Sequence, residues 1–162
     1  MFKGLANRWG RQLFVAGLTA ILTLAGTSAF SAELPRNPDE LVRVIREAIE
    51  TSDYERIRQI VYWENVSSIK RRIVRFQIRR GLGRPIRSIS FEDFPKGGLK
   101  GVNATGKLMA NMPVTNRVRV VYDEPPIEMT GKPPTYVYLI GKVDDAYRIS
   151  LVVRKPGVDD DD

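Results

Sequence analysis

Apolar residues recur at helical spacing in the chain after residue 37. In the stretch that begins at Pro38 they occupy positions i, i+3, i+4, i+7 and i+8, namely Leu41, Val44, Ile45, Ala48 and Ile49. This spacing puts one apolar stripe on one face of a helix. Asn37 precedes the proline and Glu40 stands three residues after Asn37, which is typical of a helix start. The pattern therefore predicts an amphipathic helix over residues 38–50.

Two further helical patterns follow. Residues 52–55 repeat the capping-box pattern, and the next apolar residues, Tyr54, Ile57, Ile60 and Val61, predict a short second helix that ends near Tyr62 and Trp63. A third helix is expected from Asn65 to Arg80, with Gly81 as the stop signal. We expect its core-facing residues to be Val66, Ile69, Ile73 and Phe76.

Beyond Gly83 the period changes from helical to alternating. Residues 86–94 predict a strand with a bulge near Ser88, and residues 114–123 predict a strand with one buried face. Residues 135–142 and 146–154 predict a hairpin that turns at 143–145. Because no helical pattern interrupts these strands, we expect an antiparallel sheet and the fold class α+β.

The segments between the strands carry weaker signals. Residues 96–106 contain four glycines and predict a loop, and residues 101–107 match the first seven positions of a phosphate-binding loop. Leu108 stands where that motif needs Ser or Thr, so no nucleotide site is expected. The apolar run 107–113 is compatible with an exposed edge, a partner-docking segment or a short core strand.

The element order and the hairpin sequence together resemble a known fold. Residues 142–149 read Lys-Val-Asp-Asp-Ala-Tyr-Arg-Ile, and the resemblance of residues 38–154 is to the nuclear transport factor 2-like superfamily of the cystatin-like group. It implies N-terminal helices packed on a curved, mainly antiparallel four-stranded sheet, the cystatin-like cone, with a cavity at its open end. Some members use that cavity for catalysis on small molecules and others for binding or dimerisation, so a homodimer is compatible with it.

The first 32 residues are typical of a Sec-type signal peptide. Lys3, Arg8 and Arg11 precede an apolar run from Leu13 to Ala25, and small residues follow up to Ala32. The alternative is a retained membrane anchor, but a spanning helix needs about 20 apolar residues. We therefore expect a signal peptide over 1–32, a single domain over 33–158, an acidic tail over 159–162 and a periplasmic or secreted protein.

The composition removes several kinds of chemistry. The chain of 162 residues has no Cys and no His, which excludes disulfides, thiolate or imidazole catalysis and the usual zinc sites. No metal or cofactor is expected. Without the three cations of the signal peptide and the four acids of the tail, 26 basic and 19 acidic residues become 23 and 15, a net charge of +8. Such a charge favours an anionic partner: an acidic protein, an envelope polymer or a membrane surface.

The basic residues are concentrated in residues 70–87, where eight of 18 residues are cations and none is an acid. On a helix they form an electropositive stripe, and an anionic partner would relieve its repulsion. The alternative is a solvated face neutralised by acids elsewhere in the chain. Nucleic acid is not an expected partner, because the stripe lacks interleaved aromatic residues. The candidate partner-binding residues are Lys70, Arg71, Arg72, Arg75, Arg79, Arg80, Arg84 and Arg87.

A second set of residues would line the open end of a cone. Acidic pairs stand at strand ends, and a buried carboxylate with a raised pKa there would suit proton transfer. Aromatic residues beside them would suit a small apolar ligand. The residues are Tyr62, Trp63, Phe91, Glu92, Tyr122, Asp123, Tyr136 and Tyr138. We expect a non-enzymatic interaction module with a basic helix; the alternative is a small-molecule-binding protein or acid-base enzyme that uses the cavity.

Overall fold

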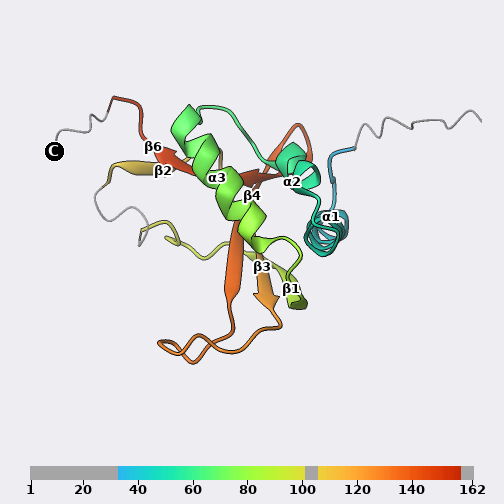
Figure 1. Cartoon of the computed structure of the whole chain (residues 1–162). Helices are drawn as coiled ribbons and strands as arrows, with labels where there is room; N and C mark the ends of the chain where they lie inside the picture. Colours follow the sequence, from blue (N-terminus) through green and yellow to red (C-terminus); the bar gives the residue numbers. More distant parts are fainter. Residues whose placement is uncertain (1–32, 101–105, 158–162) are drawn as a thin grey trace, which may run out of the picture. The chain divides into compact units, whose positions relative to one another are not determined.

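The computed structural model describes residues 33–100 and 106–157 (Figure 1). All of them belong to one compact unit, Ser31–Asp162. The predicted signal peptide 1–32, the acidic tail 159–162 and residues 101–105 of the glycine-rich motif lie outside the described residues. In the described part, three helices precede a mainly antiparallel four-stranded sheet, so the α+β prediction is confirmed.

Helix α1 (Pro38–Glu50) forms as its sequence pattern predicts. The Asn37 side-chain oxygen accepts a hydrogen bond of 2.9 Å from the Glu40 N–H, and all five residues of the predicted stripe are buried. The Glu40 carboxylate in turn accepts from the Arg36 N–H at 2.9 Å, one residue before the cap. The Asn37 and Glu40 side chains thus each accept a hydrogen bond from a backbone N–H at the start of the helix.

Helix α2 (Tyr54–Ile60) begins one residue later than the Ser52 pattern indicates. The cap is Asp53, whose side chain accepts from the Arg56 N–H, while Ser52 adopts a left-handed φ of 58° in the turn after α1. The Asp53 N–H donates to the Ala48 carbonyl at 2.8 Å, which holds α2 against the end of α1. After α2 the chain reaches the sheet, because Val61 pairs with Ile149 as an isolated parallel bridge.

Helix α3 (Ser68–Gly81) starts three residues later than expected, because Ser67 is its cap and Asn65 has a left-handed φ of 55°. The expectation that Ile69, Ile73 and Phe76 face the core is wrong. These residues are 68%, 46% and 62% exposed, and the buried residues are instead Val74, Ile78 and Gly81. Val66, just before the helix, is buried as expected.

The reason lies in the spacing of two apolar sets on one helix. Positions 69, 73 and 76 and positions 74, 78 and 81 both follow i, i+4, i+7, so periodicity alone does not distinguish the two faces. A Cβ atom at Gly81 would lie 2.7 Å from the hydroxyl oxygen of Tyr122. The face with Val74, Ile78 and Gly81 therefore approaches the sheet more closely than the other face could, and it is the face that packs against the sheet.

The four-stranded sheet has the order β1-β3-β4-β5 and every neighbouring pair is antiparallel. Its strands are β1 (Ile86–Asp93), β3 (Asn116–Tyr122), β4 (Thr135–Val143) and β5 (Ala146–Ser150). The register of β1 shifts between Ile86 and Ser88, which confirms the predicted bulge. Asp144 and Asp145, with φ of 50° and 60°, make the two-residue turn of the predicted β4–β5 hairpin. Its second strand is shorter than the predicted 146–154, because it ends at Ser150 and residues 152–154 pair in another sheet.

A second, two-stranded sheet pairs β2 (Leu108–Ala110) with β6 (Val152–Arg154). Residues 107–113 thus include a short strand, but none of its three residues is buried, and the buried residue of the segment is Met112. The segment approaches β4 closely, since a Cβ atom at Gly141 would lie 2.0 Å from the Pro113 carbonyl oxygen. Glycine is required at that position by the lack of space.

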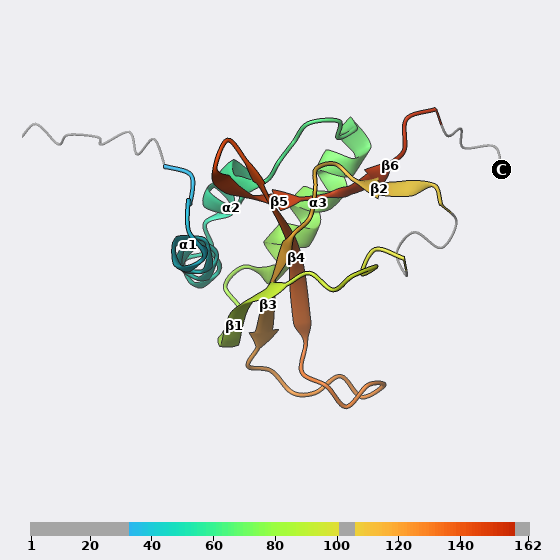
Figure 2. The same cartoon turned by 180° about the vertical axis from the view of Figure 1, so that it is seen from behind.

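The helices cover one face of the four-stranded sheet. In β3, Val118, Val120 and Tyr122 are buried, while the alternate residues Arg117 and Arg119 are half-buried. Figure 1 shows α3 crossing in front of the sheet, and Figure 2, seen from behind, shows the strands in front of α3. Within residues 33–100 and 106–157, no helix has the length and apolar character needed to cross a membrane.

Candidate functional site

Helix α3 carries the highest density of basic residues in the fold. Six of its 14 residues are Lys or Arg, and no acidic residue occurs between Glu64 and Glu92. Cations near a helix N-terminus oppose the helix dipole, and like charges one turn apart repel each other. The cations of α3 therefore destabilise the helix, unless neighbouring acidic groups offset their repulsion.

Arg71 is held by the backbone that precedes α3. Its Nε donates to the Val66 carbonyl at 3.1 Å and its Nη2 donates to the Trp63 carbonyl at 2.9 Å. The guanidinium also lies 5.6 Å from the centroid of the Trp63 ring. Arg71 therefore fixes the α2–α3 connection, and its donors are partly used within the protein.

The two arginines beyond the helix are in ion pairs. Arg84 makes two hydrogen bonds of 2.6 Å to the Glu124 carboxylate, and Arg87 bonds Asp123 at 2.9 Å. The hydrogen bond from Arg84 lowers the pKa of Glu124, and the same contact raises the pKa of Arg84. The structure therefore does not bring the eight predicted cations together as one free surface.

The remaining cations of α3 lack such acidic partners in the described part of the chain. Among the described residues, no acidic group forms an ion pair with any of the five, Lys70, Arg72, Arg75, Arg79 and Arg80. Arg79 stacks on the Tyr54 ring at 5.0 Å, and Arg80 lies 5.7 Å from the centroid of Phe76. Aromatic faces attract cations without neutralising them, so the charge stays available to an outside anion.

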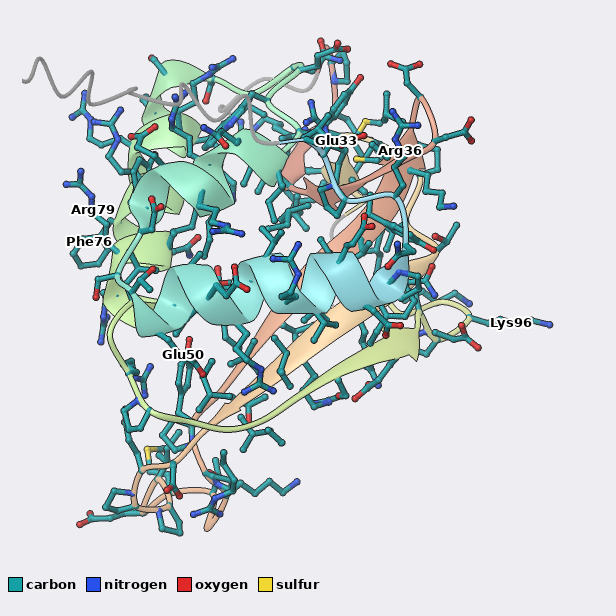
Figure 3. The ribbon with its side chains drawn as sticks, turned by 90° about the vertical axis from the view of Figure 1, so that its right-hand side faces the viewer. Glu33, Arg36, Glu50, Phe76, Arg79 and Lys96 are labelled. Carbon is teal, nitrogen blue, oxygen red and sulfur yellow. The ribbon has the colours of Figure 1, made fainter. Side chains whose placement is uncertain are left out.

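The exposed apolar residues of α3 share this side of the helix. Figure 3 shows Phe76 and Arg79 side by side on α3, both pointing away from the sheet. At about 100° per residue, Phe76, Ile69 and Ile73 fall within an arc of about 60°. We define the outward face of α3 as Ile69, Arg72, Ile73, Arg75, Phe76, Arg79 and Arg80. An apolar ridge bordered by arginines is the unusual feature of this face.

The residues expected to share a cavity are separated in the structure. Tyr62 and Trp63 line an open cleft of about 810 Å³ at the α2–α3 connection, together with Arg58, Arg71 and Arg148. Tyr136 and Tyr138 line a different gap of about 160 Å³ between α3 and the sheet. Phe91 packs edge-on against Tyr147, with the ring centroids 5.5 Å apart.

Glu92 lies on the sheet face opposite the helices. It bonds Arg117 at 2.6 Å and Arg119 at 2.9 Å, and the hydrogen bond from Arg119 is the largest cause that lowers its pKa to about 2. A carboxyl group with such a low pKa is ionised near neutral pH and has no proton to donate as a general acid. Asp123 is exposed and pairs with Arg87. Neither carboxylate has the buried setting that the acid-base alternative requires.

Of the tyrosines beneath α3, Tyr122 and Tyr138 belong to the core and Tyr136 is partly buried against it. Burial raises the pKa of Tyr122, Tyr136 and Tyr138, so all three are neutral phenols at physiological pH. The Tyr122 hydroxyl has no hydrogen-bond partner among the described residues.

Within that same part of the chain, no cluster of acidic residues has the arrangement of a metal site.

Two features of this region were missed by the sequence analysis. The first is the exposed apolar ridge, for which the signal was the second i, i+4, i+7 set on α3. The second is Asn111, whose side-chain amide donates to the carbonyls of Tyr62 and Glu64 at 2.8 and 3.0 Å. Asn111 thereby ties the loop before α3 to the segment that follows β2, and no local pattern indicates such a contact.

Comparisons of this chain with protein-family models, with curated proteins and with solved structures find no match. The function must therefore be argued from the surface of the fold itself.

Proposed function

We propose that the chain is an exported, non-enzymatic interaction module that binds an anionic partner through the outward face of α3. The observation that carries this proposal is the set of five α3 cations that form no ion pair with any described residue, in a stretch with no acid from residue 65 to residue 91. The basic stretch predicted from sequence is thus divided. Arg71, Arg84 and Arg87 make contacts within the fold, and the cations of the outward face bind the partner.

The electrostatics of α3 favour a bound anion. Arg72, Arg75 and Arg79 lie at i, i+3 and i+7, so each is within one helical turn of another. Each like-charge pair costs a few tenths of a kcal/mol in the free protein. An anion between them would remove that repulsion and accept two parallel hydrogen bonds from an arginine fork.

The location and the fold family are part of the proposal. The basic and apolar leader pattern in residues 1–32 supports export to the periplasm or outside the cell. The order of helices before strands and the β4–β5 hairpin support a cone of the nuclear transport factor 2-like type. Neither feature by itself selects an activity.

A charge-matched comparison tests the proposed function. The substitutions Arg72→Gln, Arg75→Gln and Arg80→Gln remove three cations from the outward face. The control removes three exposed cations elsewhere, Lys96→Gln, Lys100→Gln and Lys132→Gln. We expect the α3 variant to elute from immobilised heparin at clearly lower salt than the control. Equal elution of the two variants would show that net charge alone governs retention and would refute the site.

A second candidate function is small-molecule binding in the cleft at the α2–α3 connection. The favouring observation is the presence of Tyr62 and Trp63 beside Arg58, Arg71 and Arg148 in one open cleft. An apolar ring with an anionic group would fit both parts of that lining. The two tryptophans of the chain are Trp9 and Trp63, so in the protein without the expected signal peptide 1–32 the fluorescence of Trp63 reports on the cleft.

Titration with anilinonaphthalene sulfonate tests this second candidate. Binding in the cleft would quench Trp63 and would be weakened by Arg148→Gln, whereas Arg46→Gln, on α1, would leave it unchanged. An identical titration curve for the two variants would refute binding in the cleft.

A further inference from the structure

The outward face of α3 combines two properties that seldom occur together on a solvated helix. Ile69 is 68% exposed and Phe76 is 62% exposed, although the opposite side of the same helix is buried in the core. Arg72, Arg75 and Arg79 border this ridge on one side, and Arg80 lies over the Phe76 ring. Exposed apolar residues flanked by cations are typical of a helix that lies in the surface of a membrane.

We propose that the outward face of α3 docks on an anionic phospholipid surface, with Ile69, Ile73 and Phe76 entering the boundary between headgroups and acyl chains. This inference rests on the proposed function, because it names the anionic partner of the same site. The helix lies flat on the membrane and does not cross it. Arg72, Arg75, Arg79 and Arg80 bind the phosphate groups beside the inserted side chains.

A lipid surface explains the face better than a soluble polyanion does. A polyanion would contact the arginines and leave Ile69 and Phe76 in water. A bilayer offers negative phosphates above an apolar layer, so both kinds of side chain are satisfied in one contact. The long arginine stems lie along the apolar layer while their guanidinium groups reach back to the phosphates.

A lipid surface also explains the face better than an acidic protein does. Carboxylates of an acidic protein would have to leave water to pair with an arginine beside the apolar ridge, and that desolvation offsets much of the attraction. Here Arg80 lies against Phe76, within the apolar ridge itself, and the face includes no acid. At a membrane surface this mixture is favourable, because each cation near anionic lipid adds about fivefold to the affinity.

Vesicle binding by two kinds of variant separates charge from insertion. The probe is vesicles of phosphatidylcholine with phosphatidylglycerol, and vesicles of phosphatidylcholine alone are the neutral comparison. We expect binding to the anionic vesicles alone. The variant Arg72→Gln, Arg75→Gln, Arg80→Gln should bind about 100-fold more weakly. The variant Ile69→Ser, Phe76→Ser keeps every cation and should bind about tenfold more weakly, because exposed apolar area no longer enters the bilayer.

The apolar variant has a matched control and is expected to fold. Its two positions are exposed, and the control Met129→Ser, Val137→Ser removes two exposed apolar residues that lie off α3, which are 95% and 38% exposed. The control should bind vesicles like the unmodified protein. Equal vesicle binding by the apolar variant and its control would overturn the lipid proposal.

Insertion is measured directly with a dye, because the chain has no cysteine. Phe76→Cys and, separately, Val137→Cys each provide one attachment point for an environment-sensitive nitrobenzoxadiazole label. On anionic vesicles, the label at position 76 should shift to the blue and brighten, and the label at position 137 should not change. The same response at both positions, or at neither, would overturn the proposed orientation.

The heparin comparison separates failure of the lipid proposal from failure of the proposed anion-binding function. If the protein binds heparin through the outward face but does not bind anionic vesicles, the lipid proposal fails and the proposed function stands, with an acidic protein or polymer as partner. If the α3 variant matches its charge control on both probes, both proposals fail.

Discussion

The guanidinium carbon of Arg84 lies 3.8 Å from the centroid of the Tyr122 ring. The same side chain makes two hydrogen bonds of 2.6 Å to Glu124. Arg84 thus bridges the turn after α3 and the end of β3 through one aromatic face and one carboxylate. This contact places the C-terminal end of α3 on the sheet and turns the outward face toward solvent.

Replacing Arg84 by Lys should destabilise the protein by about 1 kcal/mol, because lysine keeps the charge but loses the planar stacking on Tyr122. Urea unfolding followed by circular dichroism measures the change. Arg87→Lys is the control, since the Arg87–Asp123 pair is exposed and contributes little. If both variants had the same midpoint, Arg84 would have no special part in seating α3.

The buried hydroxyl of Tyr122 should cost stability in the native protein. No described residue hydrogen-bonds it, so Tyr122→Phe should stabilise the fold by about 1 kcal/mol. Gly81→Ala should destabilise it by about 1–3 kcal/mol, because the new methyl group would lie 2.7 Å from that hydroxyl oxygen.

The two substitutions should also be coupled. The Tyr122→Phe variant lacks the hydroxyl oxygen, and the next nearest atom to the new methyl group is the ring carbon Cζ at 3.8 Å. Gly81→Ala should therefore cost much less stability in that variant. A double-mutant cycle of unfolding free energies measures the coupling. Strictly additive effects would mean that α3 does not approach Tyr122 as closely as the structure has it.

The Glu92 pair network should make stability depend on acid pH. The pKa of Glu92 is lowered from 4.5 to about 2, so the folded state holds the proton less tightly than the unfolded state does. The resulting stability is fully present above the ordinary carboxyl pKa and is lost as the pH falls toward 2. Glu92→Gln should therefore destabilise the protein at neutral pH, and its difference from the unmodified protein should shrink below about pH 4.

Urea midpoints measured across this pH range give the test, with Glu128→Gln, an exposed carboxylate outside the network, as the comparison. A Glu92→Gln difference that stayed constant with pH would contradict the role assigned to Arg117 and Arg119.

Asn111 should be intolerant of change despite its place in a loop. Its side-chain oxygen accepts from the Leu151 N–H at 2.8 Å, and its amide donates to the carbonyls of Tyr62 and Glu64. Asn111→Ala leaves these partly buried groups unpaired and should cost about 2–3 kcal/mol. Asn116→Ala is the matched control and should cost less than 1 kcal/mol, because the Asn116 amide bonds two exposed side chains, those of Asp93 and Thr115. Thermal unfolding of the two variants decides between these outcomes.

Much of the fold was predictable because its signals are local. The stripe of α1, the bulge near Ser88 and the turn at Asp144 each depend on a few adjacent residues, and each is confirmed. The buried face of α3 was not predictable in the same way. Two apolar sets with one spacing compete there, and the choice depends on Gly81 meeting Tyr122, a residue 41 positions away.

The candidate cavity shows a second kind of limit. Phe91 and Glu92 are adjacent in β1, so their side chains point to opposite faces of the sheet and do not line one cavity. Phe91 packs with Tyr147 on the helix side, and Glu92 pairs with arginines on the other. Ion pairs such as Arg84–Glu124 join residues 40 positions apart, and no periodicity in the sequence specifies them.

The alternation of β3 gives the domain two chemically different sides. The side chains of Val118 and Val120 lie in the core on the helix side, and those of Arg117 and Arg119 lie on the reverse of the sheet with Glu92. A domain resting on a surface through α3 would keep that reverse side directed away from the surface. Its orientation would then be fixed by a single helix, and a second partner would meet the arginine–glutamate network first.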